Sequence, residues 1–400
     1  YLLESGYIGD VRTFYCPSST DMVSRIPHSR MRYRTPSYRI GDWADDVSDF
    51  KRAGGYDAES VLYGDWNFLH TYGVRHDIGE PQPPRVHALG HLINDRLGNL
   101  GMTVELTEPV ASRPDPDSSL PDLADQMAAG EVDRLLILGQ NPVYTSPADV
   151  PFAQLLDQVD FSLHLGMCRD ETAHHCQWHV PRSHPLEAWG DIRATDGTAS
   201  LLQPAIEPLY NSRTTHELLA SLLGEADLTS REIVAQFWET RWQQFRPGES
   251  FASGWERSLE AGVVPGTASR PTTAAIADDF TPADPPAADP EADPDRLHVV
   301  FRPDPSVWDG RFANNGWLQE LPKPLTSLTW DNAALIAPQT AERLGVDDED
   351  VVELTYAEGT VRAPVKILPG HPPGTVTCRL GYGRRAGGDI GQGVGFDAYA

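Results

Sequence analysis

The chain has 400 residues, of which 40% are hydrophobic, so it is long enough for two or three domains with substantial cores. Its formal net charge of −26 argues against nucleic acid as a partner, because phosphate contacts require a basic surface. Only three of the 32 basic residues are lysines, which is typical of a surface that stays soluble in salt. No apolar stretch approaches the roughly 18 residues that a membrane-spanning helix requires.

Residues 1–78 are predicted to form a small β-rich unit. The runs GYIGDVRTFYC and VLYGDWNF are rich in β-branched and aromatic residues, and the polar segment between them has no helical period. Pro83 and Pro84 then interrupt the chain, and its character changes.

Residues 79–270 are predicted to form an α/β domain. Apolar residues recur at three and four positions from Val86 to Leu97, which predicts a helix ending at Gly98 or Gly101. The run MTVELT, residues 102–107, is then expected to be a strand.

The same succession of helix and strand recurs twice, in residues 120–138 and 152–166. This alternation predicts a parallel sheet with helices on its faces. Two more helices are expected within residues 214–245, the second capped by Thr229 or Ser230.

Two further segments follow. Residues 271–295 contain mainly Ala, Asp and Pro, and are expected to be a disordered or extended linker. Residues 296–400 contain short alternating strands, a hairpin turn at Ala357–Thr360 and one helix that ends at Gly345. This pattern predicts a small closed β-barrel.

One turn stands out as a possible ligand site. The apolar run before Gly139 predicts a buried strand, and Asn141 and Pro142 follow at once, with Thr145 close behind. In open α/β sheets, ligands bind at the ends of such strands. The alternative is that this turn only ends a buried strand.

A second cluster combines histidine and cysteine. His175, Cys176 and His179 are the weak candidates for metal ligands, and His175 and His179 would share one face of a helix. The prolines that follow break helices, however, and nothing nearby is spaced like a zinc ribbon, so polar packing or a subunit contact is favoured over bound metal. Cys168 and Cys176 are the pair that could form a disulfide, although the cysteine density argues against a disulfide framework.

Several enzyme classes lack support in the sequence. There is no G-x-S-x-G motif, no P-loop and no G-x-G-x-x-G fingerprint. Four aromatic residues among Arg and Asn have the composition of an interface core, although packing between domains of the chain is an equal alternative: these are Trp308, Phe312, Trp317 and Trp330.

Several long stretches carry a family resemblance. They are PQPPRVHALGHLIN, VDRLLILGQNPVYTSPADVPF, LHLGMCRDETAHHCQWHVPRSHPLEAWGD, WDGRFANNGWLQELPKPLTSLTWDN and GYGR. Residues 81–400 resemble the molybdopterin oxidoreductase superfamily, and most closely the large iron–sulfur/molybdopterin-like subunit of alternative complex III, a quinol-oxidising respiratory complex.

The resemblance implies a Rossmann-like domain followed by a double-psi β-barrel that binds a molybdopterin-dinucleotide in true molybdoenzymes. Gly139, Asn141, Pro142 and Thr145 would then form a vestigial turn facing the pterin. The relatives in alternative complex III are similar in fold but lack this cofactor, so none is expected in this segment, and 4Fe-4S clusters are expected in a region beyond it.

By the same likeness, the segment is a scaffold of a respiratory complex and is not itself catalytic. Its implied partners are a multihaem cytochrome and polytopic membrane subunits, at the periplasmic, outer face of the cytoplasmic membrane. The rival interpretation is an active oxidoreductase carrying molybdopterin guanine dinucleotide.

Residues 1–78 have a separate resemblance, to prepilin-like proteins with an H-x9-DG signature. The Asp-Gly of that signature is Asp65-Trp66 here, and its histidine is missing. A third, lower interpretation of the chain is therefore a pilin-like export or surface protein.

Overall fold

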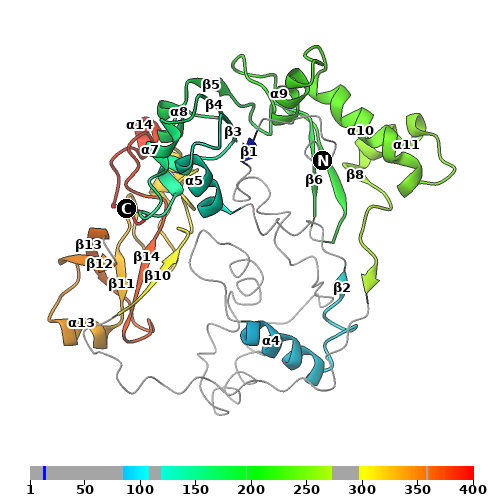
Figure 1. The fold of residues 1–400 in the computed structure, drawn as a ribbon. Coiled ribbons are helices and arrows are strands. Elements are labelled where there is room, and N and C mark those ends of the chain that lie inside the picture. Colours follow the sequence, from blue (N-terminus) through cyan, green and yellow to red (C-terminus); the bar gives the residue numbers. More distant parts are fainter. Residues whose placement is uncertain (1–11, 15–83, 108–118, 195, 273–296, 357–358) are drawn as a thin grey trace.

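The computed structural model describes residues 12–14, 84–107, 119–194, 196–272, 297–356 and 359–400 (Figure 1). Most of the predicted N-terminal unit and of the predicted linker, and the tip of the predicted hairpin turn, therefore lie outside the described residues. The one described element from the first 78 residues is β1 (Arg12–Phe14), which pairs with a strand of the α/β region.

A four-stranded parallel sheet forms the centre of the α/β region, in the order β1-β3-β4-β5. Its members after β1 are β3 (Arg134–Leu138), β4 (Phe161–Gly166) and β5 (Trp178–Pro181). The helices around it are α5 (Leu120–Ala128), α6 (Pro142–Thr145), α7 (Phe152–Leu156), α8 (Glu171–His175) and α9 (Thr215–Leu222). The predicted parallel sheet is thus present.

Helices cover both faces of this sheet because the side chains of β3 alternate. Leu135 and Ile137 pack with α5 and α7 in one apolar cluster. Leu136 and Leu138 pack on the other face, against leucines of α9. All four side chains are nearly inaccessible, which explains why β3 appears in the sequence as an uninterrupted apolar run.

The prediction of a strand at residues 102–107 is wrong. Helix α4 (Pro84–Arg96) forms as expected, but the carbonyl of Asn99 then accepts the N–H groups of residues 102, 103 and 104, which makes a tight turn. Only β2 (Leu106–Thr107) is a strand, and it pairs antiparallel with β9 (Pro271–Thr272) outside the parallel sheet.

The middle of the chain adds a smaller unit of helices and antiparallel strands. Helix α10 begins after Thr229, whose hydroxyl and the Glu232 carboxylate form a capping box, as the sequence predicts. Trp238 and Trp242 of α10 are almost fully buried. The elements are β6 (Gly190–Arg193), β7 (Ala199–Leu202), α10 (Ser230–Phe245), α11 (Phe251–Ala261) and β8 (Val263–Val264).

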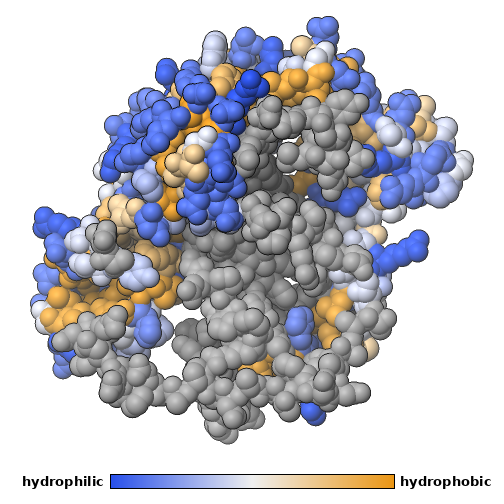
Figure 2. Space-filling model, in the orientation of Figure 1, coloured by the Kyte–Doolittle hydropathy of each residue, from blue (hydrophilic) through white to orange (hydrophobic). Residues whose placement is uncertain are grey.

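The C-terminal region forms a mixed five-stranded sheet in the order β10-β14-β11-β13-β12. The hairpin between β12 and β13 is antiparallel, as predicted, and α13 ends at Gly345 in the left-handed conformation. Apolar surface gathers over these strands on the face drawn in Figure 2. The elements are β10 (His298–Arg302), α12 (Gly316–Glu320), β11 (Ala334–Ile336), α13 (Pro338–Leu344), β12 (Val351–Tyr356), β13 (Gly359–Ile367), β14 (Thr375–Arg379) and α14 (Gly388–Gly391).

Lys323 anchors the loop that precedes β11. Its ammonium donates to the carbonyl of Asp331 and to the hydroxyl of Tyr382, each at 2.8 Å, and lies 3.8 Å from Asp304. Only 5% of Lys323 is exposed, and burial lowers the pKa of its ammonium.

Within the described residues, no helix is long and apolar enough to span a membrane.

Candidate functional site

The loops that follow β3, β4 and β5 meet at the carboxyl edge of the parallel sheet, where open α/β sheets bind ligands. The N–H of Gly139 donates to the carbonyl of Leu165 at 2.7 Å, and the N–H of Arg182 donates to that of Gly166 at 2.9 Å. These bonds bring the loops after the three strands together.

The predicted turn at Gly139 lies at this edge, but the chain's own side chains surround it. Gly139 has a φ of 77°, and a Cβ there would overlap the guanidinium of Arg182. Pro142 is buried at the start of α6, and the Thr145 hydroxyl donates to the Asn141 carbonyl at 3.1 Å. The structure thus brings together all four predicted residues.

The Asn141 side chain has partners at both of its polar atoms. Its Oδ1 accepts from the N–H and the hydroxyl of Thr172, at 3.1 and 2.7 Å. Its Nδ2 donates to Glu171 at 2.7 Å. Asn141 therefore links the β3 turn to α8.

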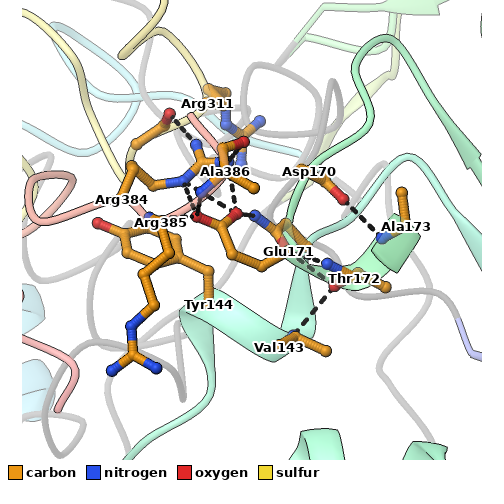
Figure 3. Close-up of polar contacts among 12 residues, drawn as sticks. Val143, Tyr144, Asp170, Glu171, Thr172, Ala173, Arg311, Arg384, Arg385 and Ala386 are labelled. Carbon is orange, nitrogen blue, oxygen red and sulfur yellow. Dashed lines mark hydrogen bonds and ion pairs between the residues drawn. The ribbon is translucent and has the colours of Figure 1, made fainter. Parts of the chain in front are cut away.

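Glu171 connects this edge to the C-terminal region, as Figure 3 shows. Its carboxylate accepts two bonds from Nε of Arg384, at 3.0 and 3.1 Å, and one from Nη2 at 2.7 Å. It also accepts the backbone N–H groups of Arg385 and Ala386, at 2.9 and 2.8 Å. Both ionic side chains are 8% exposed.

Burial and the charge of Arg384 give three carboxyl groups around this edge different pKa values. Burial alone would raise the pKa of Glu171, but the hydrogen bonds and charge of Arg384 lower it to about 2. Burial raises the pKa of Asp170 and that of Asp397 to about 6 each. The edge therefore holds one strongly ionised carboxylate beside two that titrate near neutral pH.

Tyr144 makes a second connection between the two regions. Its hydroxyl donates to the carbonyl of Tyr382 at 2.7 Å, and its ring meets that of Tyr399 edge-on at 5.1 Å. The guanidinium carbon of Arg384 lies 4.7 Å from the centre of the Tyr144 ring. The C-terminal region is therefore fastened to the carboxyl edge by polar and aromatic contacts.

A buried histidine pair lies behind the turn. Nε2 of His164 is 2.9 Å from the carbonyl oxygen of Gln140, so Nε2 carries the proton and donates. Nδ1 of His164 then accepts from Nδ1 of His179, 3.1 Å away. Burial lowers the pKa of His164 to about 4, which keeps it neutral at pH 7.

The three weak metal candidates do not converge. His175 ends α8 and lies 2.9 Å from Asp157, whereas His179 belongs to β5, so the expectation that they share a helix face is wrong. The Cys176 thiol packs against the apolar cluster beneath α5 and α7, and burial raises its pKa to about 11. Among the described residues, no three His, Cys, Asp or Glu side chains form a metal-binding group. Cys168 and Cys176 are free thiols.

The aromatic cluster near α12 is largely exposed. Trp317 is 88% accessible, and Phe312 and Trp330 are also exposed, whereas Trp308 is partly buried. Leu325, which the sequence analysis did not single out, is 86% accessible and has a φ of 70°. The described residues therefore leave most of this surface uncovered.

Sequence reasoning missed the residues that make most of the polar contacts at the edge. Glu171 lay within the string noted for its histidines, and Arg384 within GYGR, but no local spacing relates positions 213 residues apart. The available signal was that each lies five residues after the end of a strand, Glu171 after β4 and Arg384 after β14, within reach of the edge where that strand ends.

Comparisons with known proteins identify the C-terminal region. Residues 318–396 match the family described as molydopterin dinucleotide binding domain. A stretch of 73 residues, 18% of the chain, is 37% identical to the thiosulfate reductase molybdopterin-containing subunit PhsA of Salmonella typhimurium, and covers 10% of that protein.

Two further matches are longer. The chain is 27% identical over 278 residues to the menaquinone reductase, molybdopterin-binding-like subunit, of Nitratidesulfovibrio vulgaris. This alignment covers 65% of this chain and 37% of the relative. The acetylene hydratase from Pelobacter acetylenicus aligns with a TM-score of 0.45 at 17% identity, over 65% of this chain and 39% of that one. The chain thus spans 10% and 37% of the curated relatives it matches. Residues 318–396 thus match the molydopterin dinucleotide binding domain family, and the chain is homologous to the menaquinone reductase, molybdopterin-binding-like subunit.

Proposed function

We propose that this chain is a scaffold module of a quinone-linked respiratory electron-transfer complex, of the quinol-oxidising alternative complex III type, and carries no molybdenum cofactor of its own. The relative from Nitratidesulfovibrio is named a molybdopterin-binding-like subunit of a menaquinone reductase, which supports membership of such a complex. The iron–sulfur clusters, the quinone chemistry and the whole complex's activity would belong to other regions or subunits.

The observation that carries this proposal is the occupation of the turn by the chain's own groups. A pterin dinucleotide is anionic and needs donors at the carboxyl edge. Here the Asn141 amide donates to Glu171, and Arg384 and its neighbouring N–H groups also donate to that carboxylate. A carboxylate with a pKa of about 2 is ionised at pH 7 and repels phosphate. The residues at this turn therefore do not fit the dinucleotide.

The finer fold assignments belong to the same proposal. The β3–β4–β5 sheet with helices on both faces supports a Rossmann-like domain. The mixed order of the C-terminal strands and their match to the dinucleotide-binding family support a double-psi barrel at residues 296–400.

The proposed partners are a multihaem cytochrome and polytopic membrane subunits, at the outer face of the cytoplasmic membrane. The exposed aromatic surface around Trp317 and Leu325 supports a protein contact, since tryptophan is enriched where interfaces have most of their binding energy.

The test is elemental and pterin analysis of the purified full-length complex. We expect iron and haem in stoichiometric amounts, with molybdenum, tungsten and oxidised pterin below about a tenth of an equivalent per chain. Stoichiometric molybdenum or tungsten with pterin would favour the alternative proposal, an active enzyme that carries molybdopterin guanine dinucleotide. The family match of residues 318–396 is the observation that supports this alternative.

A further inference from the structure

The surroundings of Glu171 have the form of an anion-binding site. Five donor groups converge on its carboxylate: Nδ2 of Asn141, Nε and Nη2 of Arg384, and the N–H groups of residues 385 and 386. Figure 3 shows the Glu171 carboxylate beside Arg384 and Ala386. Consecutive backbone N–H groups beside a guanidinium are a common means of holding a carboxylate or phosphate oxygen.

Most of these donors belong to the C-terminal region, and the carboxylate reaches them from α8. Residues 384–386 are more than 200 positions from Glu171 in the sequence, so a change at Glu171 does not alter the local backbone that carries these donors. Arg384 has a further bond, from Nη1 to the carbonyl of Gly310 at 2.6 Å, that fixes its guanidinium without Glu171. A site built this way is expected to persist when the carboxylate is removed.

We propose that Glu171 is the internal ligand of an oxyanion site formed by Asn141, Arg384 and the N–H groups of residues 385 and 386, and that it is the residue that excludes external anions from this site. The inference rests on the proposed function, because it assigns to Glu171 the place that an anionic group would take.

Neighbouring charges define the class of anion. The charge of Arg385 acts on Asp397, whose pKa it lowers, and Arg311 is paired with Asp309 at 2.6 Å. Asp170 and Asp397 oppose further negative charge. Replacing one carboxylate by one monoanion leaves the charge unchanged, whereas a phosphate dianion adds one more negative charge. The site should therefore prefer small monoanionic carboxylates, such as formate, over phosphate.

The test is chemical rescue in the full-length chain. Glu171→Ala removes the carboxylate and leaves space for formate, whereas Glu171→Gln fills the same space with a neutral amide. We expect Glu171→Ala to melt below wild type, and formate at about 100 times its dissociation constant to raise its Tm by about 3 °C. Formamide, a neutral molecule of the same shape, and chloride at equal ionic strength should have no such effect.

Matched variants distinguish an anion-binding site from a purely structural ion pair. Glu217 also accepts several donors, from Thr214 and Ser230, but these do not include a guanidinium. Wild type, Glu171→Gln and Glu217→Ala should show no formate-dependent rise, and phosphate should stabilise Glu171→Ala less than formate does.

Three results would overturn the proposal. One is equal response of Glu171→Ala to formate, formamide and chloride, which would make Glu171–Arg384 a structural contact only. The second is a formate response in wild type, which would mean that Glu171 excludes nothing. The third applies if Glu171→Ala does not fold. Glu171→Ser is then purified with and without formate, and an equal yield of folded protein under both conditions would overturn the proposal. None of these results changes the molybdenum content of the complex, so this inference fails independently of the scaffold proposal.

Discussion

Three carboxyl groups near the junction of the α/β and C-terminal regions respond to pH in opposite directions. Glu171 has a lowered pKa, so its contribution to stability is present above the ordinary value and is lost as the pH falls toward about 2. Asp170 and Asp397 have raised pKa values of about 6, so the stability they contribute is complete below pH 3.8 and is lost as the pH rises through about 6. Because two groups lose stability as the pH rises above 3.8 and one gains it only up to about 4.5, the contact should be most stable at about pH 4.

Asp397→Asn tests this at one residue. Asparagine keeps an oxygen to accept the N–H of Tyr399, a bond of 2.9 Å in the structure, and removes the charge that burial and Glu171 oppose. We expect the variant to gain about 1–3 kcal/mol in unfolding free energy at pH 8 and to match wild type near pH 4. Urea unfolding across this pH range measures the difference.

Asp389→Asn is the control, since Asp389 is exposed at the start of α14. It should leave the pH profile unchanged. If Asp397→Asn is destabilised at pH 8, the charge of Asp397 stabilises the native state through Arg385, and the assignment of a raised pKa is wrong.

Single residues were predictable where local chemistry decides their position. Gly139, Asn141 and Pro142 form the turn expected of them, because glycine and Asn-Pro restrict the backbone within a few residues. Glu171 and Arg384 were not predictable, because their contact depends on how two separate regions pack. The site residues that sequence identified are therefore the backbone-shaping ones, whereas most of the ionic contacts required the structure.

At the level of elements, a glycine of α11 packs against a tryptophan of α10. Gly254 of α11 lies directly against the indole of Trp242, which is 1% exposed. Phe251, one turn earlier, meets the Trp242 ring edge-on at 5.5 Å and stacks on Trp255 at 5.4 Å. The absence of a side chain at Gly254 therefore permits the two helices to approach.

Gly254→Ala tests how much this close packing contributes to the unfolding free energy. Alanine favours a helix over glycine by about 1 kcal/mol, but its Cβ would overlap a buried ring that cannot move without displacing the aromatic cluster, which costs about 1–3 kcal/mol. We expect a net loss of unfolding free energy by urea denaturation. Ser253→Ala, on the exposed side of α11, should change it by less than about 0.5 kcal/mol. A stabilised Gly254→Ala would show that propensity outweighs this contact.

Helices and strands marked by a clear apolar pattern or a capping motif were predicted well, whereas the short strand β2 was not. Strand β3 has a continuous apolar run, β4 alternates apolar and polar residues, and α10 has its capping box, so their positions follow from sequence. Residues 102–107 alternate like a strand, yet the turn around Asn99 leaves only β2 to pair. Periodicity cannot anticipate a turn that is stabilised by bonds to a preceding backbone carbonyl.

At the scale of the whole molecule, the apolar surface around α12 contrasts with the charge of the chain. Among residues 311–330, Glu320 is the single acidic residue, in a protein with 58. Arg311 is paired with Asp309, and Lys323 is buried, so this surface is almost neutral. Leu325, Ser327 and Trp330 have positive φ values, a backbone state that is costly for such residues.

The double variant Trp317→Ala/Leu325→Ala tests whether this surface binds a partner subunit. Both side chains are more than four-fifths exposed, so the stability of the isolated chain should change by less than about 0.5 kcal/mol. Loss of two anchors should weaken association about 30-fold or more, and co-purification of partner subunits from cells should fall accordingly.

Tyr356→Ala provides the control, because Tyr356 is an exposed aromatic residue on the edge strand β12. It should co-purify with partners as wild type does. Unchanged subunit stoichiometry in the double variant would remove the support that this surface gives to a protein contact.

The buried position of Lys323 gives the chain a chemical reporter of unfolding. Lysine occurs at positions 51, 323 and 366 alone, and the ammonium of Lys323 is enclosed by a carbonyl and a phenol. Amine-reactive reagents should therefore acylate the partly exposed Lys366 in native protein and spare Lys323. The rate of acylation at Lys323, measured by mass spectrometry of the peptide that contains it, would then report the rate at which the C-terminal sheet opens.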